Sequence, residues 1–142
     1  PSEEAAVNLR HRSNVVQTHG NTALDAVLDM NETTSPSTGN PYAVVLLHRF
    51  EFLTNRPLVE QTLRTLADET PVPCRFFVDE FAKETLADLL PTLTETIAVT
   101  GKLPHEQFVE LLRHAEFIVT DSGGTQAEAA LLGTPTLVHR RA

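Results

Sequence analysis

The stretch D-S-G-G-T-Q-A-E, which begins at Asp121, combines the groups that bind a phosphorylated ligand. Gly123 and Gly124 allow a ligand to come close to the main chain. If a helix begins here, its unpaired N–H groups around Ser122 and the positive end of its dipole face the same point, where a phosphate binds. Glu128 shares a helix face with Gly124, and because a carboxylate is a poor neighbour for a phosphate, we expect it to bind the hydroxyls of a sugar such as ribose. We expect Asp121 to cap the helix.

This stretch needs a strand before it and a helix after it, and the sequence supplies both within a regular alternation. Apolar runs rich in β-branched residues predict five strands, at about 43–47, 74–78, 96–99, 117–120 and 136–138. Helical periodicity predicts four helices between them, at about 56–68, 80–90, 104–114 and 124–132. Gly133 and Pro135 supply the stop signal after the last helix. The alternation is typical of an α/β fold that is Rossmann-like, a doubly wound parallel sheet with helices on both faces.

His48 and Arg49 follow the first of these strands, as Asp121 follows the fourth. In the usual strand order of a doubly wound sheet these two strands are neighbours where the winding reverses, and ligands bind at their carboxyl ends. We therefore expect His48 and Arg49 to face the Ser122 turn across a crevice, where His48 binds a ligand or takes part in catalysis. The other histidines show no metal-ligand spacing, so we expect no metal site.

Length and composition restrict the chain to one main domain and argue against several kinds of partner. With 142 residues, of which 41% are apolar, the chain can bury one core. The net charge of −8 and the lack of a basic stripe in the sequence argue against nucleic acid and an anionic membrane as partners. No apolar run reaches membrane-spanning length and no signal-peptide pattern opens the chain, so we expect a cytoplasmic protein. The single cysteine, Cys74, lies in an apolar run and is expected to be a buried structural thiol.

Residues 1–41 do not follow the alternation and form a separate segment before the Rossmann-like domain at 42–142. This segment is predicted to contain a helix at 2–11, a strand at 14–18, a helix at 22–30 and a polar linker at 31–41. Because the chain begins with Pro1 rather than Met, we expect it to be a fragment of a longer protein.

Three parts of the chain match motifs that occur together in one protein family. D-S-G-G-T-Q-A-E with L-L-G-T-P-T-L-V behind it is similar to D-S-G-G-x-Q-E-E followed by L-G-x-P, with Ala127 in place of the first Glu. Residues 17–26 are similar to V-T-G-N-T-V-x-D-A-L, which lies at the crossover between the two halves of the family's fold. Residues 48–52, H-R-F-E-F, are similar to H-R-R-E-N. Nearly the whole chain thus resembles the UDP-N-acetylglucosamine 2-epimerases.

The resemblance implies the carboxyl-terminal, UDP-binding half of a two-domain GT-B-like fold, with the amino-terminal catalytic half absent from this chain. The full-length parent would be a homodimer that interconverts UDP-N-acetylglucosamine and UDP-ManNAc for polysaccharide biosynthesis. In this family UDP is eliminated and then added again on the other face of the sugar, with no cofactor and no metal. The acidic residues that move the protons belong to the absent half, so the fragment alone is expected to be inactive.

The resemblance also implies roles for single residues. The residues that match the family's UDP-binding positions are Arg49, Phe108, Ser122, Gly123, Gly124 and Glu128. The Ser-Gly-Gly main chain would bind the diphosphate and Glu128 the ribose, while His48 would be catalytic. Phe108 matches a family Phe that lies against the uracil, but it fits equally well as a core residue on the apolar stripe of its helix.

Two other functions fit the same residues. A GT-B glycosyltransferase would use the same carboxyl-terminal nucleotide site, and product analysis on the full-length protein would separate it from an epimerase. A non-catalytic nucleotide-binding homologue is favoured by the altered loops. In these loops Phe50 and Phe52 replace Arg and Asn, and Asp79 follows the second strand where the family usually has His.

Overall fold

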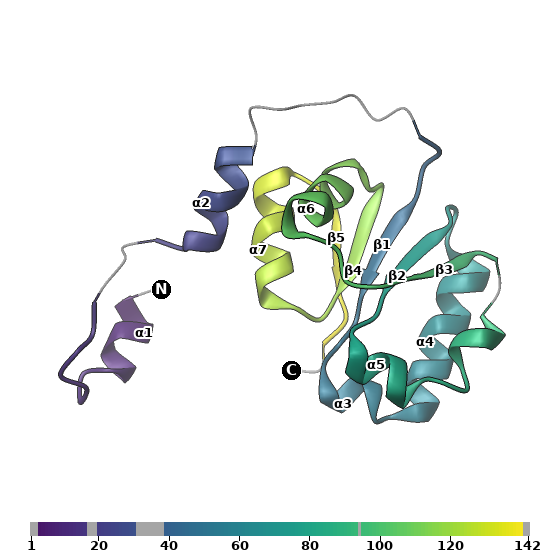
Figure 1. The fold of residues 1–142 in the computed structure, drawn as a ribbon, viewed down its shortest axis with the longest axis horizontal. Coiled ribbons are helices and arrows are strands. Elements are labelled where there is room, and N and C mark those ends of the chain that lie inside the picture. The colour runs from purple at the N-terminus through teal and green to yellow at the C-terminus, as the bar shows by residue number, and fades with distance from the viewer. Residues whose placement is uncertain (1–2, 17–19, 31–38, 94, 141–142) are drawn as a thin grey trace. The chain divides into compact units, whose positions relative to one another are not determined.

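The computed structural model describes residues 3–16, 20–30, 39–93 and 95–140 (Figure 1). The chain divides into two compact units, Pro1–Ser35 and Pro36–Ala142.

The first unit contains two short helices, α1 (Glu3–Asn8) and α2 (Thr22–Asp29). Helix α2 begins where it was predicted, because the side chain of Asn21 accepts a hydrogen bond from the N–H of Ala23 at 3.1 Å. The strand predicted at 14–18 is wrong for residues 14–16, and residues 17–18 lie outside the described part of the chain. A β-branched run needs a neighbouring strand to pair with, and Val16 instead has 86% of its surface exposed.

The second unit is built on a five-stranded parallel sheet with the order β3-β2-β1-β4-β5 (Figure 1). Its strands are β1 (Ala43–Leu46), β2 (Cys74–Phe77), β3 (Ile97–Thr100), β4 (Phe117–Thr120) and β5 (Thr136–Val138). The doubly wound, Rossmann-like α/β sheet predicted from the alternation is therefore confirmed.

Cys74 is fully buried as expected, and this burial raises the pKa of its thiol.

Helices cover both faces of this sheet, as predicted. They are α3 (Phe50–Leu53), α4 (Arg56–Glu69), α5 (Glu80–Thr85), α6 (His105–His114) and α7 (Gly123–Leu132). On one face, Val45 of β1 packs in a core with residues of α3, α4 and α5. On the other face, its neighbour Val44 packs in a second core with residues of α6 and α7. Because successive side chains of a strand point to opposite faces of the sheet, the strands contribute to two separate cores.

Two helical segments differ from the prediction. The helix predicted at 80–90 ends at Thr85, and the chain continues to a short 3-10 turn at Leu90–Thr92. Pro91 lies inside this 3-10 turn, near its start, where the missing N–H of proline is tolerated. Leu86 and Leu89 still contact the core. Their helical spacing therefore reflects that they are buried, although the helix does not continue through them. Helix α3 was missed because four residues are too few to show a helical period.

Candidate functional site

The candidate site lies where the winding of the sheet reverses. Strands β1 and β4 are hydrogen-bonded neighbours, with Leu46 in register with Thr120. The prediction that these two strands adjoin is confirmed, and the residues that follow them leave the sheet at the same carboxyl edge. His48 and Arg49 follow β1, and the Ser122 turn follows β4.

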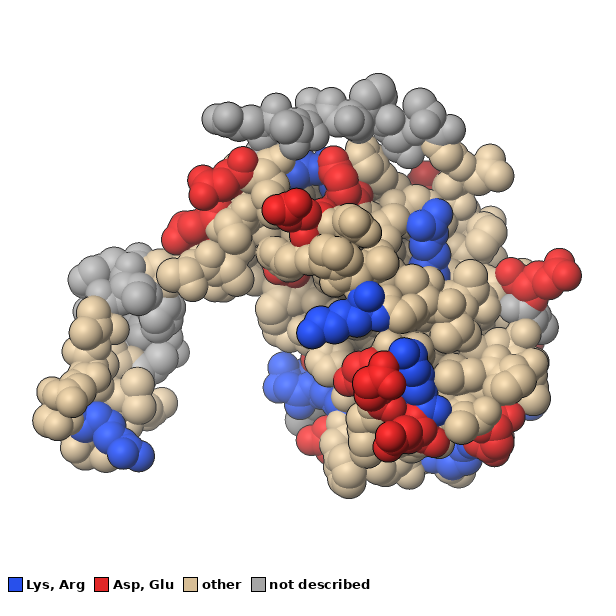
Figure 2. Space-filling model, in the orientation of Figure 1, with Lys and Arg blue, Asp and Glu red and all other residues tan. Residues whose placement is uncertain are grey.

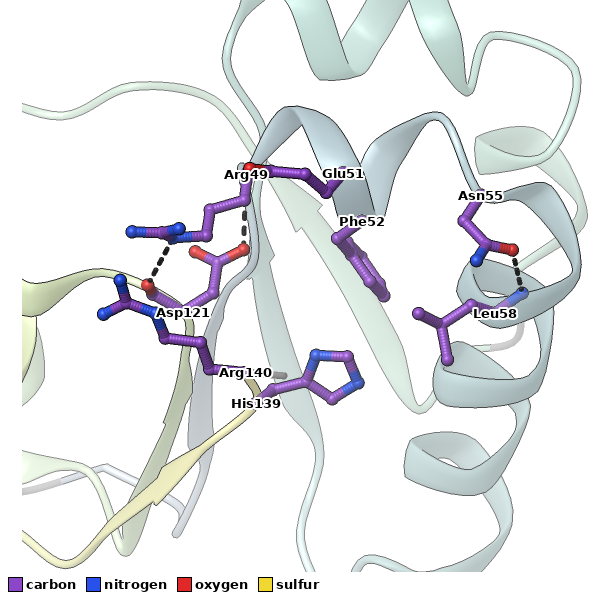
Figure 3. Close-up of a pocket in the computed structure, with 8 residues that line it drawn as sticks. All are labelled: Arg49, Glu51, Phe52, Asn55, Leu58, Asp121, His139 and Arg140. Atoms are coloured by element: carbon purple, nitrogen blue, oxygen red, sulfur yellow. Dashed lines mark hydrogen bonds between the residues drawn. The ribbon is translucent and has the colours of Figure 1, made fainter. Parts of the chain in front are cut away.

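Asp121 joins the two loops at this edge. Its carboxylate is buried, with a residue exposure of 1%, and accepts a hydrogen bond from the main-chain N–H of His48 at 3.1 Å. It also accepts one from the main-chain N–H of Arg49 at 2.9 Å (Figure 3). The ring nitrogen Nδ1 of His48 lies 3.5 Å from Oδ1 of Asp121. In return, Nε of Arg49 donates to the main-chain oxygen of Asp121 at 3.1 Å. The carboxylate therefore fixes His48 and Arg49 beside the turn that carries Ser122.

The expectation that Asp121 caps the helix is wrong. Ser122 is the capping residue of α7, and its Oγ accepts a hydrogen bond from the N–H of Thr125 at 3.4 Å. The carboxylate of Asp121 instead accepts from two N–H groups of the loop after the neighbouring strand, which the sequence around Asp121 does not reveal. His48 and Arg49 could have been found as its partners only from the strand order.

The turn at the start of α7 leaves its main chain open. Gly123 and Gly124 are exposed, and a Cβ atom added to Gly123 would meet no protein atom within 4 Å. Neither glycine has a positive φ, whereas Gly133 at the other end of the helix does, at 74°. Within the described chain, neither packing nor backbone conformation thus requires glycine at position 123. The open main chain and the helix N-terminus together suit an approaching anion.

Glu128 is buried on α7 and has a partner that sequence reasoning missed. Its Oε1 lies 2.8 Å from Nε2 of His105, the first residue of α6. His105 is 23 residues earlier in the chain, so the spacing of residues within one helix could not predict the contact. The pair exists because α6 and α7 pack side by side over the same face of the sheet (Figure 1).

Phe108 of α6 is half-buried and contacts the core. Its ring lies edge-on to Phe77 of β2, with 5.3 Å between the ring centroids and an angle of 78°. This contact bears out the core interpretation of Phe108. Part of the ring nevertheless stays accessible, so the contact with uracil remains a prediction.

A hollow of about 210 Å³ at this edge only partly overlaps the candidate site (Figure 3). Its lining residues are Arg49, Glu51, Phe52, Asn55, Leu58, Asp121, His139 and Arg140. Arg49 and Asp121 are shared with the candidate site, whereas Phe108, Glu128 and the Ser-Gly-Gly turn lie outside the hollow. Helix N-termini bind anions on open surface as well as in cavities, so the turn rather than the hollow is the candidate anion site.

The surface charge, the possible metal ligands and the length of the helices add three observations. On the face shown in Figure 2, lysines and arginines are interspersed with aspartates and glutamates rather than gathered in a stripe. Among the residues that the structure describes, no three His, Cys, Asp or Glu side chains are placed to hold a metal ion. None of the helices in the described part of the chain is long and apolar enough to cross a membrane.

The comparison with known families identifies the chain. The family model described as UDP-N-acetylglucosamine 2-epimerase matches residues 1–142. The chain belongs to this family. A UDP-N-acetylglucosamine 2-epimerase of Salmonella borreze is 28% identical over 167 aligned residues, which cover 99% of this chain and 43% of the relative. A second epimerase, from Campylobacter jejuni, is 48% identical over 44 residues, which cover 31% of this chain and 12% of the relative. The chain thus spans less than half of the length of these curated relatives.

Solved structures of epimerases share the fold. The UDP-GlcNAc 2-epimerase of Methanocaldococcus jannaschii in complex with UDP-GlcNAc and UDP has a TM-score of 0.77 at 24% identity, covering 97% of this chain and 43% of that chain. The Neisseria meningitidis enzyme bound to UDP-GlcNAc has a TM-score of 0.75 at 24% identity, covering 100% and 44%. The Escherichia coli heptosyltransferase WaaC with ADP also shares the fold, with a TM-score of 0.58 at 20% identity, covering 92% and 40%. These likenesses support the Rossmann-like fold of the epimerase family.

Proposed function

We propose that this chain is the UDP-binding part of a UDP-N-acetylglucosamine 2-epimerase that interconverts UDP-GlcNAc and UDP-ManNAc. The observation that carries the proposal is the open Ser122-Gly123-Gly124 turn at the point where β1 meets β4, in a chain of this family. A diphosphate would accept hydrogen bonds from the main-chain N–H groups of this turn and lie at the positive end of α7. Glu128 would accept from the hydroxyls of the ribose, and Phe108 would lie against the uracil.

His48 and Arg49 would act on the same diphosphate from the other side of the cleft. The side chain of His48 is 40% exposed, and since its Nδ1 faces Asp121, Nε2 is the nitrogen left for a ligand. Arg49 supplies a permanent positive charge at the same edge. Both groups are held by Asp121 before any ligand arrives, which is the condition for electrostatic stabilisation to lower a barrier.

The step that these groups would assist is the departure of UDP from the sugar. When the bond between C1 and the phosphate oxygen breaks, negative charge grows on the diphosphate. Main-chain N–H groups and cationic side chains that bind this charge more tightly than they bind the intact substrate accelerate the step. The groups that move protons on the sugar would come from an amino-terminal half, so we propose that the chain alone binds UDP without epimerase activity.

The glycosyltransferase alternative has less support. The family model covers the whole chain and describes an epimerase, whereas the likeness to the heptosyltransferase reaches only 20% identity and concerns the fold. Homodimer formation by the full-length protein, a cytoplasmic location and a part in polysaccharide biosynthesis are proposals that rest on the family resemblance alone.

Titration of the ¹⁵N-labelled chain with UDP tests the proposed site. We expect chemical-shift changes centred on the amides of Ser122, Gly123 and Gly124, with a dissociation constant in the micromolar to millimolar range because half of the cleft is missing. Phosphate alone and uridine alone serve as control ligands that should each reproduce part of the pattern. No binding at millimolar UDP, or changes confined to other parts of the domain, would contradict the proposal. Formation of UDP-ManNAc by the chain alone would show that the proton-transferring groups are already present.

A further inference from the structure

The proposed function leaves one well-defined contact without a role, the pair formed by His105 and Glu128. The two atoms that meet, Nε2 of His105 and Oε1 of Glu128, are 2.8 Å apart. An ionised carboxylate can only accept a hydrogen bond, so the N–H group is at Nε2 of His105 and donates the hydrogen bond to Oε1 of Glu128. The exposure of the two side chains differs, 47% for His105 and 11% for Glu128. A surface imidazole therefore holds a carboxylate that is almost enclosed.

The second oxygen of the carboxylate remains for a ligand. Oε2 of Glu128 has no hydrogen-bond partner within the described part of the chain, and the one enclosed side-chain nitrogen or oxygen found there without a partner is Nε2 of Gln126. Among the described residues, Oε2 is therefore free to accept a hydrogen bond from a ligand. An acceptor that is already oriented by one donor is well suited to receive a second hydrogen bond from a hydroxyl.

We propose that His105 is a positioning residue for the nucleotide: by donating to Oε1, it fixes the rotamer of Glu128 so that Oε2 accepts from the ribose. The proposal rests on the proposed ribose-binding role of Glu128 and adds a residue outside the family motifs that carry the resemblance. A glutamate side chain has several rotatable bonds, and ordering it only when the ligand arrives weakens binding. His105 removes this cost before the nucleotide binds.

Calorimetric titration with UDP and with its 2′,3′-dideoxyribose analogue tests the proposal, because only UDP offers hydroxyls to Glu128. In His105→Ala we expect UDP to bind roughly tenfold more weakly and the analogue almost unchanged, as a charge-assisted hydrogen bond no longer orders the acceptor. His105→Gln should restore most of the affinity, since its amide nitrogen can reach Oε1. In a Glu128→Gln background, His105→Ala should add little further loss.

A matched control lies on the same helix. His114 of α6 also faces a carboxylate, with its Nε2 3.8 Å from Oε2 of Glu110, at the far end of the helix from His105. His114→Ala should leave the affinity for UDP unchanged, and thermal unfolding should show that every variant folds.

The outcomes separate the inference from the function on which it rests. Equal losses of UDP and of the analogue in His105→Ala, or no loss at all, would overturn the positioning role alone. Losses from His105→Ala that add in full to those of Glu128→Gln would also overturn it. If the wild-type chain did not prefer UDP to the analogue, the ribose assignment of Glu128 would fail, and the inference would fail with it.

Discussion

Placing a side chain at Gly123 should separate the stability of the fold from the binding of phosphate. Gly123 is the first residue of α7, is exposed, and has no positive φ. A Cβ atom at this position would meet no protein atom within 4 Å. Alanine should therefore fit without strain, and because it restricts the unfolded chain and favours a helix, it should stabilise the domain by about 0.4–1 kcal/mol.

The same Cβ atom would lie where the proposed function requires a phosphate to approach the main chain. In Gly123→Ala we expect weaker binding of UDP despite unchanged or higher stability. Gly123→Val carries a branched side chain at the same position and should weaken binding at least tenfold, which corresponds to about 1.4 kcal/mol. Valine is a poorer helix former than alanine, so the stability of Gly123→Val should lie below that of Gly123→Ala.

Two measurements on each variant give the comparison: thermal unfolding for stability and calorimetric titration with UDP for affinity. Gly101→Ala is a control glycine variant outside α7, where the nearest atom to an added Cβ is Nζ of Lys83 at 3.9 Å. This control should leave the affinity for UDP unchanged. Wild-type affinity in Gly123→Val would refute the reasoning, because it would show that no ligand approaches the main chain at this turn.

Three further predictions follow from His48, Asp121 and Cys74. In a full-length enzyme that carries this chain, His48→Ala should lower the turnover of UDP-GlcNAc with unchanged thermal unfolding, and unchanged steady-state kinetics would remove His48 from the site. Asp121→Ala leaves two N–H groups without their acceptor, so urea unfolding should show a loss of about 1–3 kcal/mol, and a loss below about 0.5 kcal/mol would contradict this role. Burial raises the pKa of the Cys74 thiol in the folded chain; the unfolded thiol ionises first, above about pH 8.5, so stability should fall as the pH rises further. This alkaline decline should be smaller in Cys74→Ala, and an equal decline in urea unfolding would contradict it.

Local patterns predicted the frame of the domain because they record local physics. The strand before Asp121 and the helix after it were found from an apolar run, a capping residue and the stop at Gly133, each of which acts within a few residues. The order of the strands followed from the general handedness and winding of parallel sheets. Neither the elements around Asp121 nor the order of the strands depends on knowing which side chains contact one another.

Local sequence patterns could not predict contacts between segments that are distant in the chain. The partners of Asp121 lie in the loop after β1 and the partner of Glu128 lies on α6, and each contact depends on how the elements stack rather than on spacing in the chain. For Asp121 the local rule even favoured the wrong answer, since an aspartate before a helix is a common cap. The candidate site was therefore predicted as a set of residues, while the interactions that orient those residues required the structure.

These interactions bear on the residues that depart from the family pattern. Asp121 holds the loop after β1 through the main-chain N–H groups of His48 and Arg49, so these bonds do not depend directly on the side chains at positions 50 and 52. Phe52 is buried in the core, and Phe50 stacks on Phe81 with 5.8 Å between the ring centroids. Both phenylalanines therefore have structural contacts that do not displace His48 or Arg49. The altered loop alone is thus a weak argument for a non-catalytic homologue, because the groups proposed to act on the diphosphate keep their positions in spite of it.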